Sequence, residues 1–265
     1  TSAFASDNAY IKAQGSAEID AIHYFEAVEG NNDVLNGNIA IFAAGNEAHP
    51  YAHYPGAFHD IISVTAFGPD YLPASYTNFG PGCNMCAPGG ESKLPPWNSY
   101  RAYVLSTVPS ETEQLYDKAS FQKGFDYGYM QGTSMACPHV SGVLALGLSY
   151  AAQQRKHFKA EEFVELMNRS AVGMDSYMAG ARLYRRYSFD LGGSSPFMQL
   201  DLSNFKGKMG YGLVNASRLL EEIDGSGTAM TFPNIYINSG SKVVVDPAIY
   251  FAGGENMEFT VTIED

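Results

Sequence analysis

Two short runs of apolar residues limit the fold of this chain more than any other feature. Residues 39–44 form a continuous apolar run, and residues 61–67 form a second run rich in apolar and small side chains. Strands that are apolar on both faces belong in parallel sheets covered by helices. Residues 103–108 repeat the pattern, and Gly and Pro punctuate the segments between the runs. We therefore predict an α/β fold with a mostly parallel sheet flanked by helices.

Three further segments have the apolar spacing of helices. Residues 16–29 and 159–171 each place apolar side chains along one helical face. Residues 134–151 form the most apolar helix of the chain, with small residues that would allow close packing, so we expect this helix to be central and buried. Pro138 is best tolerated in the first turn of a helix, which places the helix start close to Ser134.

A change of composition follows the last predicted helix. Residues 210–223 read as a turn and a short helix, after which Gly225 and Gly227 interrupt the pattern. Beyond them β-forming residues alternate with turn residues, as in a β-sandwich. We place a domain boundary near residue 225, so that residues 1–224 form one unit and residues 225–265 begin an appended β-rich domain or extension. About 40 residues are too few for an independent core.

The charge of the chain argues against one class of partner. Its 265 residues include 16 Lys and Arg against 28 Asp and Glu, a formal net charge of −12. Nucleic-acid binders need basic residues clustered on one face, and the two basic clusters here, residues 155–159 and 182–186, are short. We expect no nucleic-acid partner. No apolar run reaches the roughly 18 residues of a membrane span, so we expect no span.

Three cysteines set a limit on cross-linking. Cys83, Cys86 and Cys137 are too few for a disulfide framework, and they are one short of the usual four-ligand structural zinc site. We expect small buried side chains or at most one bridge, with at least one free thiol.

The segment GTSMACPHVSG, residues 132–142, carries the chemistry. Ser134 stands between small residues where a peptide carbonyl could approach, but a serine hydroxyl attacks poorly until a base takes its proton. Attack on an amide builds negative charge on the carbonyl oxygen, which needs fixed hydrogen-bond donors. The candidate donors are Asn46, at the carboxyl end of the strand at 39–44, and the Ser134 N–H at a helix start. The alternative is that Asn46 serves only the geometry of its turn.

These segments, in this order, resemble the subtilisin-like serine peptidases, the subtilases. GTSMACPHVSG resembles the nucleophile motif of that family, and AAGNE, residues 43–47, resembles the strand end that carries its oxyanion asparagine. The resemblance extends over roughly residues 16–223, with HYPGAFHDIISVTAF at 53–67, YTNFGPGCNMCAPGG at 76–90 and GYGLVNA at 210–216. It implies a serine endopeptidase that acts through an acyl-enzyme, with Ser134 as nucleophile and Asn46 as oxyanion donor.

The same resemblance implies a substrate pocket and a location. Ala43, Ala44 and Gly45 would wall the primary specificity pocket, with His53 at its base, where a cationic imidazole would favour an acidic or hydrogen-bonding substrate side chain. The alternative is that His53 turns out to solvent. Peptides or proteins are the expected substrates, and the mostly secreted family implies an extracytoplasmic location. No cofactor is required; subtilases often bind calcium, but the resemblance assigns no metal ligand here.

The base and aspartate of the family have no match. In the subtilases both precede the oxyanion asparagine, at an Asp-containing strand end and a His-Gly helix start, whereas only His23 precedes Asn46 here. His139 lies five residues beyond Ser134, roughly 140° around a helix, and the resemblance makes it structural. We therefore expect the chain to begin partway through its catalytic domain, to need an N-terminal segment carrying Asp and His, and to be nearly inactive alone. The alternative is a rewired base among His49, His53 and His59.

Two other interpretations compete. An esterase of the α/β-hydrolase type needs G-x-S-x-G, whereas the residue two after Ser134 is Ala136, which argues against that class. A non-catalytic peptide-binding module or pseudoenzyme on a subtilase shell is the second alternative. The residues that would separate it from an enzyme are the base and the aspartate.

Overall fold

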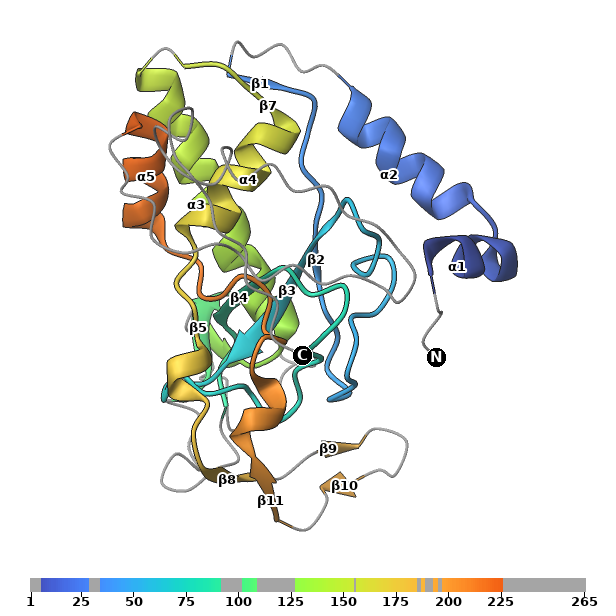
Figure 1. Ribbon diagram of the computed structural model, residues 1–265, viewed down its shortest axis with the longest axis vertical. Helices are drawn as coiled ribbons and strands as arrows, with labels where there is room; N and C mark the ends of the chain where they lie inside the picture. Colours follow the sequence, from blue (N-terminus) through green and yellow to red (C-terminus); the bar gives the residue numbers. More distant parts are fainter. Residues whose placement is uncertain are drawn as a thin grey trace, which may run out of the picture.

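A three-stranded parallel sheet lies at the centre of the computed structural model (Figure 1), which describes residues 6–28, 34–91, 102–108, 127–154, 156–184, 187–188, 193–194 and 197–225. The strands are β2 (Ile41–Ala43), β3 (Ile62–Phe67) and β4 (Met85–Pro88), in the order β2-β3-β4. The first five residues of β3 are buried, so both of its faces are covered. The prediction of an α/β fold with a parallel sheet flanked by helices is confirmed.

Three helices pack together beside the sheet: α3 (Thr133–Gln153), α4 (Ala160–Ser170) and α5 (Ala216–Asp224). They correspond to the predicted helices at 134–151, 159–171 and 210–223. The helix predicted at 16–29 is α2 (Ala17–Ala27). A further helix, α1 (Asp7–Gln14), was not predicted; it is polar, and the hydroxyl of its N-cap Ser6 accepts a hydrogen bond from the Ala9 N–H.

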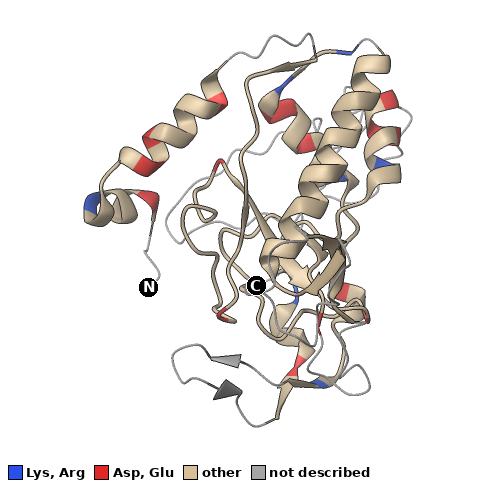
Figure 2. Ribbon diagram, turned by 180° about the vertical axis from the view of Figure 1, so that it is seen from behind, with Lys and Arg blue, Asp and Glu red and all other residues tan. Residues whose placement is uncertain are grey.

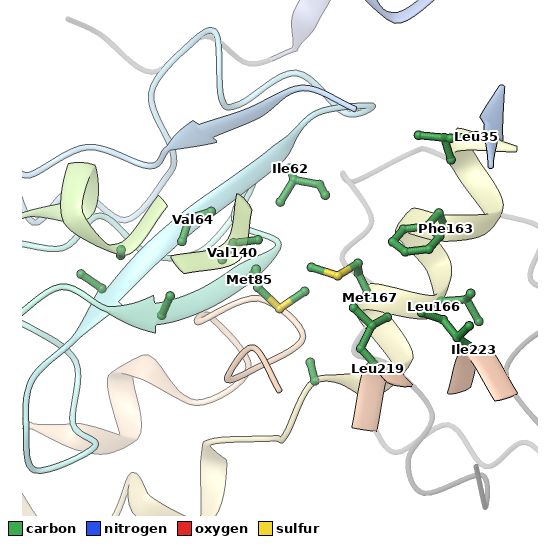
Figure 3. Close-up of a cluster of buried hydrophobic side chains, with 14 of the residues drawn as sticks. Leu35, Ile62, Val64, Met85, Val140, Phe163, Leu166, Met167, Leu219 and Ile223 are labelled. Atoms are coloured by element: carbon green, nitrogen blue, oxygen red, sulfur yellow. The ribbon is translucent and has the colours of Figure 1, made fainter. Parts of the chain in front are cut away.

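The main hydrophobic core lies between the sheet and these three helices (Figure 3). Val64 and Met85 from the sheet face Val140 of α3, and Met167 of α4 and Leu219 of α5 fill the space beyond them. Gly147 of α3 is needed for this approach, because a Cβ there would lie 2.7 Å from Leu219 Cδ2 and 3.0 Å from Phe163 Cζ. The small residues of α3 therefore set how closely α4 and α5 approach it.

The expectation that α3 is central and buried holds for only one side of the helix. One side packs on the sheet and α5, but Ser141, Gly142, Ala145 and Leu146 are exposed. Pro138 is the sixth residue of the helix and thus lies past its first turn. By length and composition alone, α3 is long and apolar enough to cross a membrane. Core helices of soluble proteins meet the same two criteria.

The predicted strand at 103–108 forms, but its environment differs from the prediction. β5 (Val104–Thr107) pairs antiparallel with β6 (Tyr127–Met130) in a separate two-stranded sheet, and its residues 105–107 are exposed. Ser106 and Thr107 tolerate water, so this run does not need cover on both faces. The ribbon leads directly into α3.

Short strand pairs complete the described structure. β1 (Leu35–Asn36) pairs with β7 (Phe158–Lys159), β8 (Ala181–Tyr184) with β11 (Met198–Asp201), and β9 (Tyr187–Ser188) with β10 (Gly193–Ser194). Two 3-10 turns lie at Asp175–Tyr177 and Leu202–Phe205. Helix α5 ends at Asp224, capped by Gly225 with a φ of 71°. The predicted β-rich segment after residue 225 lies outside the described residues.

Basic residues do not gather in one place on the described chain. Figure 2 shows Lys and Arg scattered over the described ribbon rather than gathered on one face.

All three cysteines are free thiols. Burial raises the pKa of Cys86 to about 12 and raises the pKa values of Cys83 and Cys137 above their usual range. These thiols are therefore protonated at neutral pH and are poor nucleophiles.

Candidate active site

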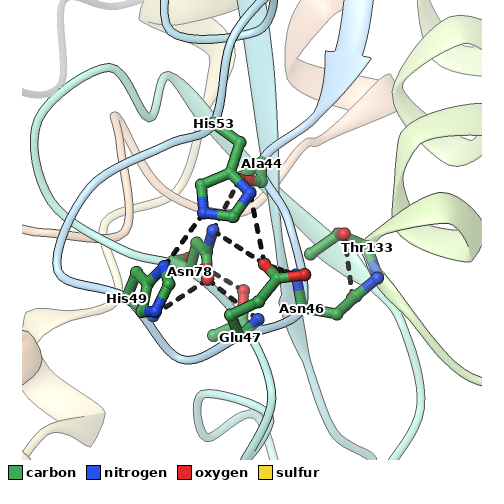
Figure 4. Close-up of polar contacts among 8 residues, drawn as sticks. Ala44, Asn46, Glu47, His49, His53, Asn78 and Thr133 are labelled. Atoms are coloured by element: carbon green, nitrogen blue, oxygen red, sulfur yellow. Dashed lines mark hydrogen bonds and ion pairs between the residues drawn. The ribbon is translucent and has the colours of Figure 1, made fainter. Parts of the chain in front are cut away.

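The carboxyl end of β2 meets the start of α3 through one asparagine. Asn46 lies three residues beyond the last residue of β2, and its side-chain Oδ1 accepts hydrogen bonds from Thr133 N–H at 2.8 Å and from the Thr133 hydroxyl at 2.9 Å (Figure 4). The ligand-binding edge of an open α/β sheet is the one at the carboxyl ends of its strands. The structure thus brings together two motifs that are 87 residues apart in sequence.

These two hydrogen bonds also orient the Asn46 amide. A backbone N–H can only donate, so the atom that faces it must be the side-chain oxygen, and the NH2 group is left to donate elsewhere. An ideal Cβ built on Gly132 would lie 3.8 Å from Asn46 Nδ2 and 3.7 Å from Ser134 N. The two expected donors therefore lie within 4 Å of the same point beside Gly132.

Ser134 is the second residue of α3 and is exposed. The first N–H groups of a helix have no intrahelical acceptor and carry the positive end of its dipole. Within the described parts of the chain, neither the N–H nor the hydroxyl of Ser134 has a hydrogen-bond partner. Both groups are thus free to act on a molecule that approaches the helix start.

The start of α3 is anchored to the end of β4 as well. The Gly132 N–H donates to Gly89 O at 3.0 Å, and it lies 3.1 Å from the Tyr76 hydroxyl. That hydroxyl lies 2.7 Å from both Gly89 O and Gly90 O. Burial raises the pKa of Tyr76 well above its usual value, so the hydroxyl stays a donor to these carbonyls. Sequence reasoning did not single out Tyr76, because its role depends on a partner 56 residues away.

Buried Asn78 shapes the loop that follows Asn46. Its Oδ1 accepts from the Glu47 N–H at 3.1 Å and the His49 N–H at 2.9 Å, while its Nδ2 donates to Ala44 O at 2.9 Å and lies 3.3 Å from Glu47 Oε2. Gly45 makes room for this side chain. Asn78 was also missed from the sequence, where only its place between β-type residues and a glycine hinted at a turn.

The structure places the predicted pocket residues side by side. Ala43 ends β2, Ala44 is fully buried, and the Ala44 carbonyl accepts from the His53 N–H at 2.9 Å. The imidazole of His53 is 23% exposed, with Nδ1 3.4 Å from Glu47 Oε2 and Nε2 2.9 Å from His49 Nδ1 (Figure 4). Its ring is held by this loop and does not point freely into solvent. Its pKa is lowered by burial and by His49, and Glu47 opposes the shift.

Three other histidines have partners away from Ser134. His139 Nδ1 lies 2.8 Å from Met135 O, His23 Nε2 is 2.7 Å from Asp60, and His59 Nδ1 is 2.9 Å from Asp7. None of these three, nor His49 or His53, makes a hydrogen bond with Ser134 among the described residues. Among the described residues, the candidate site therefore contains a hydroxyl and the two expected donors but no histidine hydrogen-bonded to that hydroxyl.

Comparison with known proteins supports the sequence resemblance. The model of the subtilase family matches residues 7–212. The major intracellular serine protease of Bacillus subtilis (strain 168) is 32% identical over 152 residues, which cover 55% of this chain and 39% of that protein. Thermitase of Thermoactinomyces vulgaris is 26% identical over 147 residues, which cover 56% of this chain and 42% of that protein. The chain thus spans about two fifths of the length of these relatives.

Two further matches bear on location and fold. An extracellular protease of Xanthomonas campestris pv. campestris is 32% identical over 152 residues, covering 57% of this chain and 23% of that protein. Relatives therefore include both intracellular and extracellular proteases. The crystal structure of a lanthipeptide protease shares the fold, with a TM-score of 0.54 and 21% identity over 84% of this chain and 60% of that one.

The packing of Gly45 against Asn78 can be tested by substitution. A Cβ on Gly45 would lie 2.3 Å from Asn78 Nδ2, and the Gly45 φ of 110° is already unfavourable for alanine. Gly15 is a matched control, because its φ is 93° and a Cβ there would meet nothing within 4 Å. We expect Gly45→Ala to lower the free energy of unfolding by about 2 kcal/mol more than Gly15→Ala, measured by urea denaturation. Equal losses would show that Asn78 does not hold this loop.

Proposed function

This chain belongs to the subtilase family, and from that premise we propose that it supplies the nucleophile and the oxyanion site of a serine endopeptidase. The observation that carries the proposal is that Asn46 Nδ2 and Ser134 N both lie within 4 Å of one point beside Gly132. Asn46 is bound to Thr133 at the start of α3, and Ser134 is the exposed second residue of that helix. The substrate class is a peptide or protein chain.

The proposed reaction proceeds through an acyl-enzyme. Ser134 Oγ gives its proton to a base and bonds to the carbonyl carbon of the scissile peptide, whose oxygen takes the negative charge. Asn46 Nδ2–H and the Ser134 N–H donate hydrogen bonds to that oxygen. The amine leaves with a proton from the base, and water then hydrolyses the ester. Loss of one such donor costs about 100- to 1,000-fold in rate, a magnitude known for the asparagine of subtilisin, a member of this family.

We place the base and its carboxylate partner outside these 265 residues. Support comes from the histidines: His49 and His53 contact one another, and His139 turns to the Met135 carbonyl of its own helix. The chain on its own should therefore be nearly inactive, because a serine without its base is a weak nucleophile.

For location we propose an extracytoplasmic protein. Fractionation of the source cells tests this, and finding the protein only in the cytoplasm would contradict it.

The nucleophile assignment is tested with a fluorophosphonate probe on the full-length protein. We expect the probe to label the wild type on Ser134 and to fail with Ser134→Ala, since only an activated serine reacts at a useful rate. Ser141→Ala is the control, because Ser141 is another exposed serine of α3. It should be labelled like the wild type, as read by mass spectrometry of the peptides.

Two outcomes would contradict the assignment. Equal labelling of Ser134→Ala and wild type would place the reactive serine elsewhere. A wild-type protein that binds peptides but reacts with no probe would favour the alternative of a non-catalytic module on a subtilase shell.

We also propose that Ala43, Ala44 and Gly45 wall the primary specificity pocket, with His53 at its base. Because burial lowers the pKa of His53, its imidazole becomes cationic only below the usual value of about 6.5. Acidification from about pH 8 to about pH 5 should then raise cleavage after Glu relative to Phe, as profiled with a peptide library. His53→Gly should abolish this change and His59→Gly, with a side chain that is 84% exposed, should keep it. A ratio that is the same in His53→Gly and wild type would remove His53 from the pocket.

A further inference from the structure

Three metal-binding side chains meet on the loop after Asn46. One ligand atom each from Glu47, His49 and His53 lies within 4.8 Å of the others. The His53 ring faces both neighbours, with Nε2 2.9 Å from His49 Nδ1 and Nδ1 3.4 Å from Glu47 Oε2, and one ion can take only one of these two nitrogens. In a tetrahedral site with bonds of about 2.0–2.1 Å, neighbouring ligand atoms are about 3.3–3.4 Å apart. Side-chain rotations that shorten the present separations of up to 4.8 Å to this spacing would bring one donor from each residue onto one ion.

Hydrogen bonds hold the backbone of this loop in place. Asn78 holds the N–H groups of Glu47 and His49, and the His53 N–H is bound to Ala44 O. The His49 carbonyl accepts from Phe79 N–H at 3.0 Å. Ala48, between two of the ligands, takes a left-handed φ of 54°. Because the loop is held in place by its neighbours, binding an ion would order three side chains and no backbone.

The side chains leave an open approach for an ion. The side chain of Glu47 is 46% exposed and that of His53 is 23% exposed, so the cluster lies at the surface. Three protein ligands leave a fourth position for water, as in zinc sites with two histidines and one glutamate.

We propose that Glu47, His49 and His53 form a binding site for a divalent transition-metal ion of the zinc type. Two imidazoles with one carboxylate favour Zn²⁺ and Co²⁺ over Ca²⁺ and Mg²⁺, which take oxygen ligands. Each imidazole must give up any proton on its ligand nitrogen to bind the ion, so binding weakens on acidification. The site lies beside the proposed oxyanion residue but does not depend on peptidase activity.

A second group of side chains provides an internal comparison. His23, Glu26 and Asp60 also place ligand atoms within 4.8 Å of one another. This group offers only one imidazole, and His23 is 50% exposed on its side-chain surface. Its single nitrogen donor makes it a weaker match for a zinc-type ion.

The test is a titration of the full-length protein with Co²⁺, whose four-coordinate complexes absorb strongly in the visible range, followed by displacement with Zn²⁺. We expect the intensity of this absorption band to saturate at one Co²⁺ per chain. His49→Ala and His53→Ala should each raise the dissociation constant at least about 100-fold, because even partners that only orient a ligand account for about 10- to 100-fold. Glu47→Gln keeps an acceptor for the Asn46 N–H and should weaken binding about tenfold or more.

Two control variants test whether the ion binds at another histidine. His23→Ala and His59→Ala should bind Co²⁺ like the wild type, and circular dichroism should show that every variant is folded. The proposal is overturned if the wild type gives no four-coordinate band, if the band survives in both His49→Ala and His53→Ala, or if His23→Ala removes it. A failure of serine labelling would leave this result untouched, since the titration measures binding alone.

Discussion

Two hydrogen bonds from Thr133 to the Asn46 side-chain oxygen join the end of a parallel strand to the start of the longest described helix. They fix the start of α3 and turn the Asn46 NH2 group away from Thr133. The NH2 nitrogen and the Ser134 N–H therefore both lie near Gly132. The bond from Gly132 N–H to Gly89 O ties the same point to the end of β4. The geometry of the candidate active site thus follows from the sheet: β2 and β4 end at one edge, and α3 begins there.

The loop beyond Asn46 depends on one buried side chain in the same way. The side chain of Asn78 contacts four groups of the segment from Ala44 to His49, and a left-handed glycine at position 45 leaves space for it. Without that side chain, the N–H groups of Glu47 and His49 would lose their acceptor. The same residue therefore supports the proposed pocket wall on one side and the proposed metal ligands on the other.

The central strands and helices could be predicted because their signals are local. The run at 61–67 and the helical spacing at 159–171 describe faces that must be covered wherever they lie. The environment of β5 could not be predicted, because its partner β6 lies beyond a segment that gives no pairing signal. Helix α1 is polar and is tied to the rest through Asp7, which accepts from the Tyr54 hydroxyl at 2.8 Å. A single polar contact of this kind produces no periodic pattern of apolar residues, so it cannot be predicted from the sequence.

Within the candidate site, sequence motifs pointed to Ser134 and Asn46 but not to Tyr76 and Asn78, which hold the backbone around them. Tyr76 and Asn78 act on atoms 56 and 31 residues away, so their roles exist only in the folded chain. The spacing of Glu47, His49 and His53 was visible in the sequence, yet convergence of the three depends on the bend at Ala48.

Whether Ser134 attacks while Asn46 and the Ser134 N–H receive the oxyanion can be decided by a crystal structure of the full-length protein with a peptide phosphonate. We expect a bond from Ser134 Oγ to phosphorus, with one phosphonyl oxygen about 2.7–3.1 Å from Asn46 Nδ2 and Ser134 N. An adduct on another residue, or an oxygen turned away from both donors, would contradict these roles.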